Sequence, residues 1–259
     1  MSDHVLSELS KGVLTLTLNR PEKMNALTRA MYKALGDAID GAADNPDIRC
    51  ILIQATGDNF TAGNDLGEFA AVNAGDTTAQ QAREDGNPLL IALGRAKTPL
   101  VAAVTGRAVG VGVTLLLHCD LVYVAQDAKL TTPFVNLALV PEAASSLLLP
   151  ARIGHVRAFS MFALGEAIDG AKAEAWGIAN AALPAAEVRA AARKAAEAVA
   201  ARAPASVTLT KALMRDRAGI EAQMDAESGD FSAQLKSPEA KEAFAAFAEK
   251  RAPDFSKVA

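Results

Sequence analysis

The chain has 259 residues, of which 51% are apolar and 22% are charged, and its formal net charge is −4. This composition excludes a disordered chain, a collagen-like chain and a small disulfide scaffold. The acidic balance argues against a nucleic-acid-binding protein, which usually carries a basic footprint. The length suits one large α/β domain or a domain with an appendage.

The two cysteines, Cys50 and Cys119, are far apart in the sequence. They fit neither a disulfide framework nor a zinc-binding spacing, which favours two reduced, buried thiols. The three histidines form no local ligand set, so we expect no metal site. No stretch reaches the roughly 18–20 apolar residues of a membrane span, and the first 12 residues lack the apolar core of a signal peptide. We therefore expect a cytoplasmic protein without membrane contact.

The first half of the chain alternates predicted strands with predicted helices. Strands are expected where residues are continuously apolar or alternate at period two, at 13–18, 50–53, 100–104 and 121–125. Helices are expected between them, from the N-cap Thr28 to an end at Asn45-Pro46, at 66–71, at 89–96 and at 113–117. This order predicts a sheet with crossover helices.

The second half is expected to be mainly helical. Residues 145–183 read as short helices, and an Ala-rich helical tail follows from Glu187, with breaks at Pro204, Gly219 and Pro238. We place a boundary near residue 200, between a core at 1–200 and a C-terminal helical region at 201–259. Residues 73–87 lack an apolar period and are a candidate lid loop.

Two segments each combine a strand, a glycine turn and the start of a helix, at 60–66 and at 108–112. Backbone N–H groups at helix starts lack intrahelical partners and carry positive partial charge. Two such groups that converge from different loops can hold an oxyanion. Both segments can also be read as ordinary strand-to-helix turns, which is the interpretation that the local pattern alone favours.

The carboxylate of Glu142 follows Leu139-Val140-Pro141 and precedes an apolar run at 147–149. It fits a residue in the first turn of a helix, where a negative charge is favoured. It also fits a general base in an apolar pocket. These two interpretations remain open at this point. His118, beside Cys119 and Asp120, is interpreted as a residue at a helix end and not as a catalytic group.

Taken together, these segments resemble the crotonase superfamily, the enoyl-CoA hydratase/isomerase family. The likeness spans about residues 5–200 and rests on four segments in the same order, at 19–27 (NRPEKMNAL), 60–66 (FTAGNDL), 97–110 (KTPLVAAVTGRAVG) and 119–123 (CDLVY). The resemblance implies an α/β fold, a spiral of ββα units followed by a helical oligomerisation region. It also implies a homotrimer or a dimer of trimers.

The resemblance further implies an acyl-CoA substrate, with no cofactor because coenzyme A is part of that substrate. It assigns the oxyanion-hole N–H groups to Asn64 and Val111. It places the other substrate-binding positions at Lys23, Met24, Ala62, Gly63, Asp65, Leu66, Gly110, Thr114 and Phe134. The side chain of Asn64 is expected to matter less than its backbone.

The departures from the family pattern suggest the type of reaction. Family hydratases add water with two glutamates, and this chain has Thr114 and Phe134 at the matching positions. Neither side chain serves as an acid or base at neutral pH. Efficient hydration is therefore not expected.

The segment from Thr132 to Glu142 and Ser145-Ser146 is similar to the peroxisomal-type Δ3,Δ2-enoyl-CoA isomerases, in which one glutamate moves the proton. One departure is Ala143-Ala144, which stands where such relatives often carry a glycine. We therefore predict an isomerase with Glu142 as its catalytic residue. Two alternatives are a hydratase or hydrolase of unusual design and a non-catalytic acyl-CoA-binding oligomer.

Overall fold

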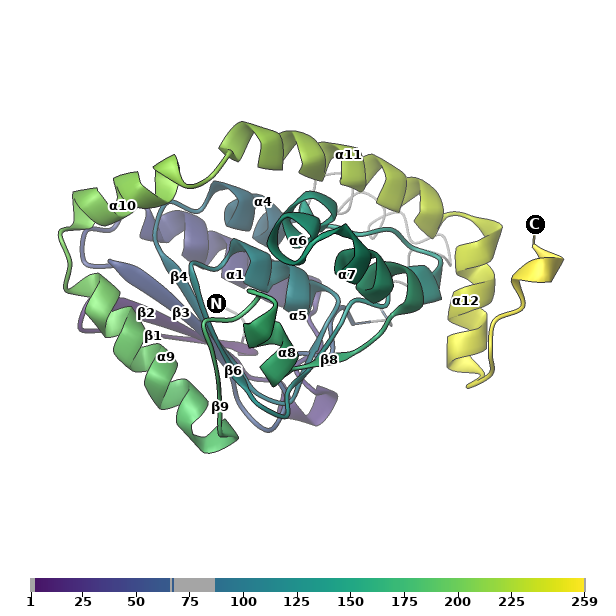
Figure 1. The fold of residues 1–259 in the computed structure, drawn as a ribbon, viewed down its shortest axis with the longest axis horizontal. Helices are drawn as coiled ribbons and strands as arrows, with labels where there is room; N and C mark the ends of the chain where they lie inside the picture. The colour runs from purple at the N-terminus through teal and green to yellow at the C-terminus, as the bar shows by residue number, and fades with distance from the viewer. Residues whose placement is uncertain (1–2, 66, 68–86, 259) are drawn as a thin grey trace.

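The computed structural model describes residues 3–65, 67 and 87–258 (Figure 1). Its larger sheet has six strands in the order β1-β2-β3-β4-β6-β9. Their bounds are β1 Val5–Ser10, β2 Val13–Leu18, β3 Cys50–Ala55, β4 Leu100–Val104, β6 Leu121–Ala125 and β9 Ala181–Leu183. From β2 to β9, neighbouring strands run parallel, as the alternation of strands and helices predicts.

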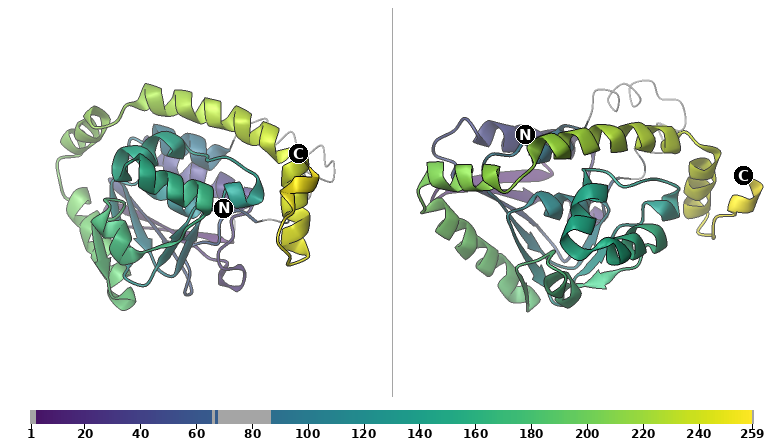
Figure 2. Two further views of the ribbon diagram at one scale, coloured as in Figure 1. Left: turned by 45° about the vertical axis from the view of Figure 1, so that its right-hand side comes forward. Right: turned by 45° about the horizontal axis from the view of Figure 1, so that its top comes forward.

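Helices cover both faces of this sheet. α9 (Ala185–Ala200) lies along one face, and α1 (Arg29–Ala42) and α4 (Pro88–Arg95) lie on the other side (Figures 1 and 2). All five residues of β4 are therefore buried, which explains their continuous apolar run. α1 begins as predicted, since the Thr28 hydroxyl accepts a hydrogen bond from the Met31 N–H.

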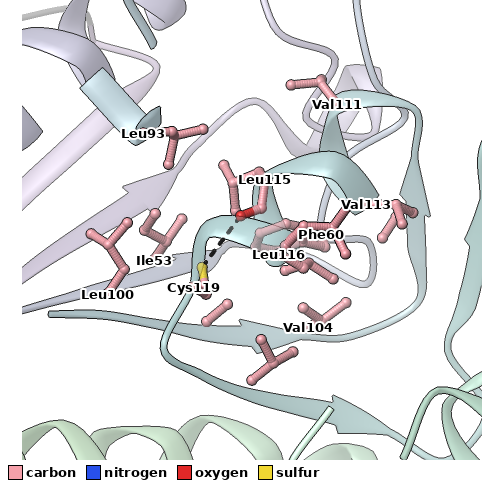
Figure 3. Close-up of a cluster of buried hydrophobic side chains, with 14 of the residues drawn as sticks. Ile53, Phe60, Leu93, Leu100, Val104, Val111, Val113, Leu115, Leu116 and Cys119 are labelled. Carbon is pink, nitrogen blue, oxygen red and sulfur yellow. Dashed lines mark hydrogen bonds between the residues drawn. The ribbon is translucent and has the colours of Figure 1, made fainter. Parts of the chain in front are cut away.

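A smaller sheet contains β5 (Arg107–Val109), β7 (Lys129–Thr131) and β8 (Ile168–Asp169). α5 (Val111–Thr114) follows β5 directly and continues as the 3-10 helix η2 (Leu115–His118). The predicted helix at 113–117 therefore begins two residues earlier. Figure 3 shows the apolar cluster around this segment, in which the Cys119 Sγ donates to the Leu115 carbonyl at 3.6 Å. Both cysteines are free and buried, as predicted.

The second half is largely helical, as expected, but residues 168–169 and 181–183, which were read as parts of short helices, form the strands β8 and β9 because they pair with β7 and β6. Its helices are α6 (Ser145–Ile153), α7 (His155–Phe159), the π-helical η4 (Ser160–Leu164), α8 (Gly170–Ala175), α10 (Pro204–Leu213), α11 (Arg217–Leu235) and α12 (Pro238–Ala248). Further 3-10 helices are η1 (Pro21–Lys23), η3 (Val135–Leu137) and η5 (Phe255–Lys257). α11 runs across α4 and α6 (Figure 2).

Two further expectations about the elements were wrong or incomplete. Gly219 does not interrupt a helix, because it lies in the first turn of α11, where the Asp216 carboxylate accepts its N–H at 3.0 Å. The strand β1 was not predicted, because only Val5 among its six residues is buried and no apolar alternation marks it. It pairs with β2 as an antiparallel hairpin through Lys11 and Gly12, both at positive φ.

The predicted helix at 66–71 and the candidate lid at 73–87 lie almost entirely outside the described residues. Asn87, at the end of that range, is the N-cap of α4, where its side chain accepts from Leu89 N and Leu90 N. In the described part of the chain, no helix is long and apolar enough to cross a membrane.

Candidate active site

The first glycine turn is attached to the loop that precedes α1. Leu27 N–H donates to the Gly63 carbonyl at 2.8 Å, and Asp65 N–H donates to the Leu27 carbonyl at 2.9 Å. Ala62 N–H donates to the carbonyl of Met24, which has a positive φ of 50°. The predicted substrate-binding positions 23–24 and 62–65 therefore form one surface, although about 40 residues separate them in the sequence. Leu66, predicted with them, is outside the described residues.

The amide of Asn25 organises this loop from the interior. Asn25 is fully buried, and its Nδ2 donates to the carbonyls of Thr56 and Asn59 at 2.9 and 2.8 Å. Its Oδ1 accepts from the Arg20 N–H at 2.7 Å. The Arg20 guanidinium in turn donates to the Asp65 carboxylate at 2.6 Å, and this bond holds the pKa of Asp65 below its usual value.

The second glycine turn lies directly beside the first. Thr61 N–H donates to the Arg107 carbonyl at 2.9 Å, and Val109 N–H donates to the Thr61 carbonyl at 3.1 Å. Gly110 then adopts φ 55° and ψ −114°, a combination that is strained for any residue with a Cβ. α5 begins at the next residue, Val111.

The two predicted oxyanion-hole N–H groups thus belong to adjacent segments. In the described part of the chain, neither the Asn64 N–H nor the Val111 N–H donates to another backbone carbonyl. Val111 is at the first position of α5, where a backbone N–H has no intrahelical partner. Among the residues that the structure describes, therefore, no backbone carbonyl competes for either N–H group with an acceptor from outside the chain.

The Asn64 side chain has a partner that the sequence did not suggest. The hydroxyl of Tyr32, on α1, donates to Asn64 Oδ1. Tyr32 lies on the buried face of α1 with a relative exposure of 7%. Its aromatic ring fits the apolar period of that helix, so no signal separated it from an ordinary core residue.

Thr114 and Phe134 are both buried. Thr114 Oγ1 donates to the Val111 carbonyl at 3.5 Å, within the short helix α5. The Phe134 ring lies 6.1 Å from the Phe162 ring, measured between centroids. Neither side chain carries a carboxylate, so neither residue supplies an acid or a base to the interior.

Glu142 is buried, with a relative exposure of 9%. It is not in the first turn of a helix, because α6 begins three residues later at Ser145 and is preceded by an N-cap at Ala144. Instead, Glu142 opens a turn in which its carbonyl accepts from the Ser145 N–H at 3.1 Å. The first-turn interpretation is therefore wrong. Leu147, expected as an apolar neighbour, is 41% exposed.

His118 connects this turn to the second glycine segment. Arg215 donates to His118 Nδ1 at 2.9 Å, so Nδ1 is an acceptor and the ring proton is on Nε2. His118 Nε2 therefore donates to the Ala143 carbonyl at 2.7 Å. Burial, together with the charge of Arg215, lowers the pKa of His118 to about 3. A neutral His118 thus ties the residue after Glu142 to the segment that begins at Val111.

A cavity of about 930 Å³ lies elsewhere, between α6, α9 and α10. None of the predicted site residues lines it. Three of its cations are bonded within the fold, because Arg152 donates to Leu117 O, Arg215 to His118 O, and Lys211 to Thr98 O and Asp120 Oδ2. The cavity is therefore distinct from the candidate active site, and its cations support the surrounding chain.

Residues 8–258 match the family described as enoyl-CoA hydratase/isomerase. The 1,2-epoxyphenylacetyl-CoA isomerase of Escherichia coli (strain K12) is 34% identical over 180 residues, which are 69% of this chain and 69% of that protein. The 2,3-dehydroadipyl-CoA hydratase of the same organism is 31% identical over 258 residues, which are 98% of this chain and 99% of that protein.

Solved structures extend the likeness to the fold. An enoyl-CoA hydratase/isomerase from Pseudoalteromonas atlantica T6c is 40% identical with a TM-score of 0.89, covering 98% of this chain and 100% of that one. OdaA from Pseudomonas aeruginosa is 42% identical with a TM-score of 0.86, covering 95% of this chain and 99% of that one. These overlaps confirm the predicted α/β crotonase-like fold with its helical C-terminal region. The chain belongs to the enoyl-CoA hydratase/isomerase family.

Proposed function

We propose that the protein is a Δ3,Δ2-enoyl-CoA isomerase in which Glu142 moves a proton between two carbons of an acyl-CoA thioester. One observation carries this proposal. Glu142 is a buried carboxylate, and the carbonyl of the next residue, Ala143, accepts a hydrogen bond from His118 at the end of η2, whereas Thr114 and Phe134 stand at the positions where family hydratases carry glutamates. A single carboxylate suffices for a proton transfer, whereas hydration also requires a bound water.

The proposed reaction begins at C2 of a 3-enoyl thioester. The Glu142 carboxylate takes a proton from C2, and the electrons move into a dienolate whose oxygen accepts hydrogen bonds from the N–H groups of Asn64 and Val111. The carboxylic acid then returns the proton to C4, which forms the C2=C3 double bond and restores the carbonyl. No oxidation or hydrolysis occurs, so this reaction needs no cofactor.

The oxyanion-hole N–H groups and the general base are expected to contribute to the reaction rate by different factors. An oxyanion donor of this kind is typically worth about 10²–10³ in rate. A positioned general base contributes roughly 10²–10⁴. The buried Phe134 supports the same reaction, because an apolar side chain there leaves no acid or base to activate water.

The test offers purified protein a 3-enoyl-CoA and, separately, a 2-enoyl-CoA. We expect conversion of the 3-enoyl ester with little hydration of the 2-enoyl ester, and we expect Glu142→Gln to lower turnover about 10²–10⁴-fold. The matched control is Glu8→Gln, on the exposed side of β1. Undiminished turnover by Glu142→Gln would overturn the assignment.

Hydration is the second candidate, because some relatives are named hydratases. It predicts loss of the double bond of the 2-enoyl ester, and that loss would persist in Glu142→Gln. Release of free CoA would point to a hydrolase instead. Binding of both esters without any turnover would point to a non-catalytic acyl-CoA-binding protein.

We also infer a trimeric assembly or a pair of trimers. The end of α10 supports this, because Leu209, Leu213 and Met214 are 63%, 88% and 80% exposed, which is unusual for large apolar side chains on one short helix. Light scattering of the purified protein would test it. A monomeric mass at micromolar concentration would overturn it.

A further inference from the structure

The turn after Glu142 has an unfavourable backbone. Ala143 and Ala144 have φ values of 63° and 54°, so two consecutive alanines occupy the left-handed region. A Cβ in that region approaches the following carbonyl oxygen, and only glycine adopts it freely. Such a conformation persists only where the surrounding structure imposes it. The observed turn therefore requires contacts that hold it.

Glu227 provides the most extensive of these contacts. It lies on α11 with a relative exposure of 6%, and its Oε2 accepts from the Ala144 N–H at 2.6 Å. Its Oε1 accepts from both the backbone N–H, at 2.9 Å, and the hydroxyl of Ser146. Gln223, one turn earlier on α11, donates to the same hydroxyl at 2.9 Å.

The charge of Glu227 suits this position. Its carboxylate faces the N–H groups at the start of α6, where negative charge is stabilised. Burial raises the pKa of Glu227, and the hydrogen bonds from Ser146 and Ala144 act in the opposite direction. The ionised carboxylate is an acceptor only, so it can take all three donors without presenting a proton to any of them, whereas an amide would turn an N–H toward one of them.

The two sides of the turn are thus held from different elements. His118 holds the Ala143 carbonyl, and Glu227 holds the Ala144 N–H. On the preceding side, Pro141 restricts its own φ to one narrow range. The backbone that carries Glu142 is therefore constrained on both sides, and one of these constraints comes from the C-terminal region.

We propose that Glu227 is a positioning residue that holds Glu142 in its reactive geometry by imposing the left-handed Ala143–Ala144 turn. This inference rests on the proposed function, in which Glu142 is the proton carrier. Glu227 acts through the turn, and no contact between its side chain and the substrate is required.

The first test compares Glu227→Gln with Glu221→Gln. Glu221 is on the same helix, but its side chain is 39% exposed and pairs only with Arg95 and Arg217 among the described residues. We expect Glu227→Gln to lower kcat about 10- to 100-fold with little change in KM, because a displacement of about 1 Å can cost 10²-fold. Glu221→Gln is expected to keep the wild-type kcat.

The second test separates positioning from general stability. Ala143→Gly together with Ala144→Gly allows the left-handed turn without an imposed constraint. In this double-glycine background, Glu227→Gln is expected to lower kcat less than about 3-fold, because glycine takes positive φ as readily as negative φ. Equal losses of kcat in both backgrounds would overturn the proposal, since they would indicate a role independent of the turn.

The melting temperature of each variant is measured alongside the kinetics, and all rates are taken well below that temperature.

If Glu227→Gln does not fold, Ser146→Ala is used in its place. This substitution removes one of the three donors to Glu227 and leaves both backbone N–H bonds. A measurable fall in kcat, again reduced in the double-glycine background, supports the proposal. An unchanged kcat overturns it.

Failure of this inference is distinguishable from failure of the proposed function. If the wild type isomerises 3-enoyl-CoA and Glu142→Gln does not, an undiminished kcat in Glu227→Gln overturns the positioning role alone. If Glu142→Gln retains full turnover, the proposed function is overturned, and the positioning role fails with it.

Discussion

A Cβ atom on Gly112 would lie 2.5 Å from the Cγ2 atom of Thr61, although the two residues belong to different turns of the site. Real Cβ atoms do not approach other atoms so closely. The Thr61 hydroxyl donates to the Asn25 carbonyl at 2.7 Å and accepts from the Gly63 N–H at 3.1 Å, so this side chain is held in place. Glycine at position 112 therefore allows the two predicted oxyanion segments to lie together.

Gly112→Ala is expected to destabilise the protein by about 1–3 kcal/mol, the usual cost of inserting a carbon into a packed interior. It should also lower kcat/KM by separating Asn64 from Val111. Adding Thr61→Ser removes the methyl group and keeps the hydroxyl, so the double variant should regain most of both losses. Chemical denaturation and steady-state kinetics check this, and a double variant no better than Gly112→Ala would contradict it.

The neutral His118 predicts a pH dependence of stability. Its pKa is 6.5 in the unfolded chain and about 3 in the folded protein, so between these values the unfolded state binds one more proton. Stability is therefore full above pH 6.5 and falls as the pH decreases toward 3, by about 1.4 kcal/mol per pH unit. Denaturant titrations of the wild type and His118→Gln should differ by this one-proton slope. Parallel stability curves would exclude the assignment of a neutral, buried imidazole.

Replacing the buried Asn25 by aspartate is a small chemical change, but we expect it to lower the stability of the protein strongly. Asn25→Asp replaces two N–H donors with oxygen, which leaves the carbonyls of Thr56 and Asn59 without these bonds. At about 1–3 kcal/mol for each buried group left unsatisfied, the loss of stability is about 2–6 kcal/mol. The control is Asn45→Asp. Among the described residues, the exposed Asn45 side chain only accepts a hydrogen bond, from the Asp47 N–H, and an aspartate accepts it equally well. Similar unfolding midpoints for both variants would refute the prediction.

We expect the two buried cysteine thiols to react slowly with thiol reagents in the native protein. Burial raises the pKa of Cys50 and of Cys119 to about 12, with the charge of Asp120 as the second cause for both. The thiolate is the reactive form, and at pH 8 it is only about 10⁻⁴ of each thiol on this basis. A thiol reagent should therefore modify neither cysteine in native protein and both in denaturant. Rapid native labelling would show that these sites open to solvent.

The sequence predicts the buried strands and the glycine turns well, because their signals are local. Leu100–Val104 is continuously apolar because helices cover both faces of this strand. Thr28 is a typical N-cap residue directly before the amphipathic helix α1. The strand β1 carries no such signal: Leu6 and Leu9 are 48% and 45% exposed, so its apolar residues do not mark a buried face. Its place in the sheet depends on pairing with β2 and not on its own burial.

The site is predictable where neighbouring residues form it and unpredictable where distant side chains hold it. From residue type alone, Gly112 indicates a close approach and Gly110 indicates an unusual backbone conformation, and the structure has both. Nothing in the sequence near Glu142 indicates that Glu227 or His118 binds its turn, because these contacts span 81 to 83 residues for Glu227 and 25 for His118. The first-turn interpretation of Glu142, one of the two that the sequence left open, failed for the same reason, since two alanines at positive φ, contacted by these distant residues, separate it from α6.

Ser146 and Glu227 are in contact but lie far apart in the sequence, and this sequence separation has a consequence for the newly synthesised chain. At about 5–20 residues per second, the 81 residues between them take roughly 4–16 s to synthesise. By then every strand of the larger sheet has been made, because the last, β9, ends at Leu183. Catalytic competence is thus expected to be the last property that a nascent chain acquires, and a prematurely terminated chain would resemble the finished protein in its interior while lacking its activity.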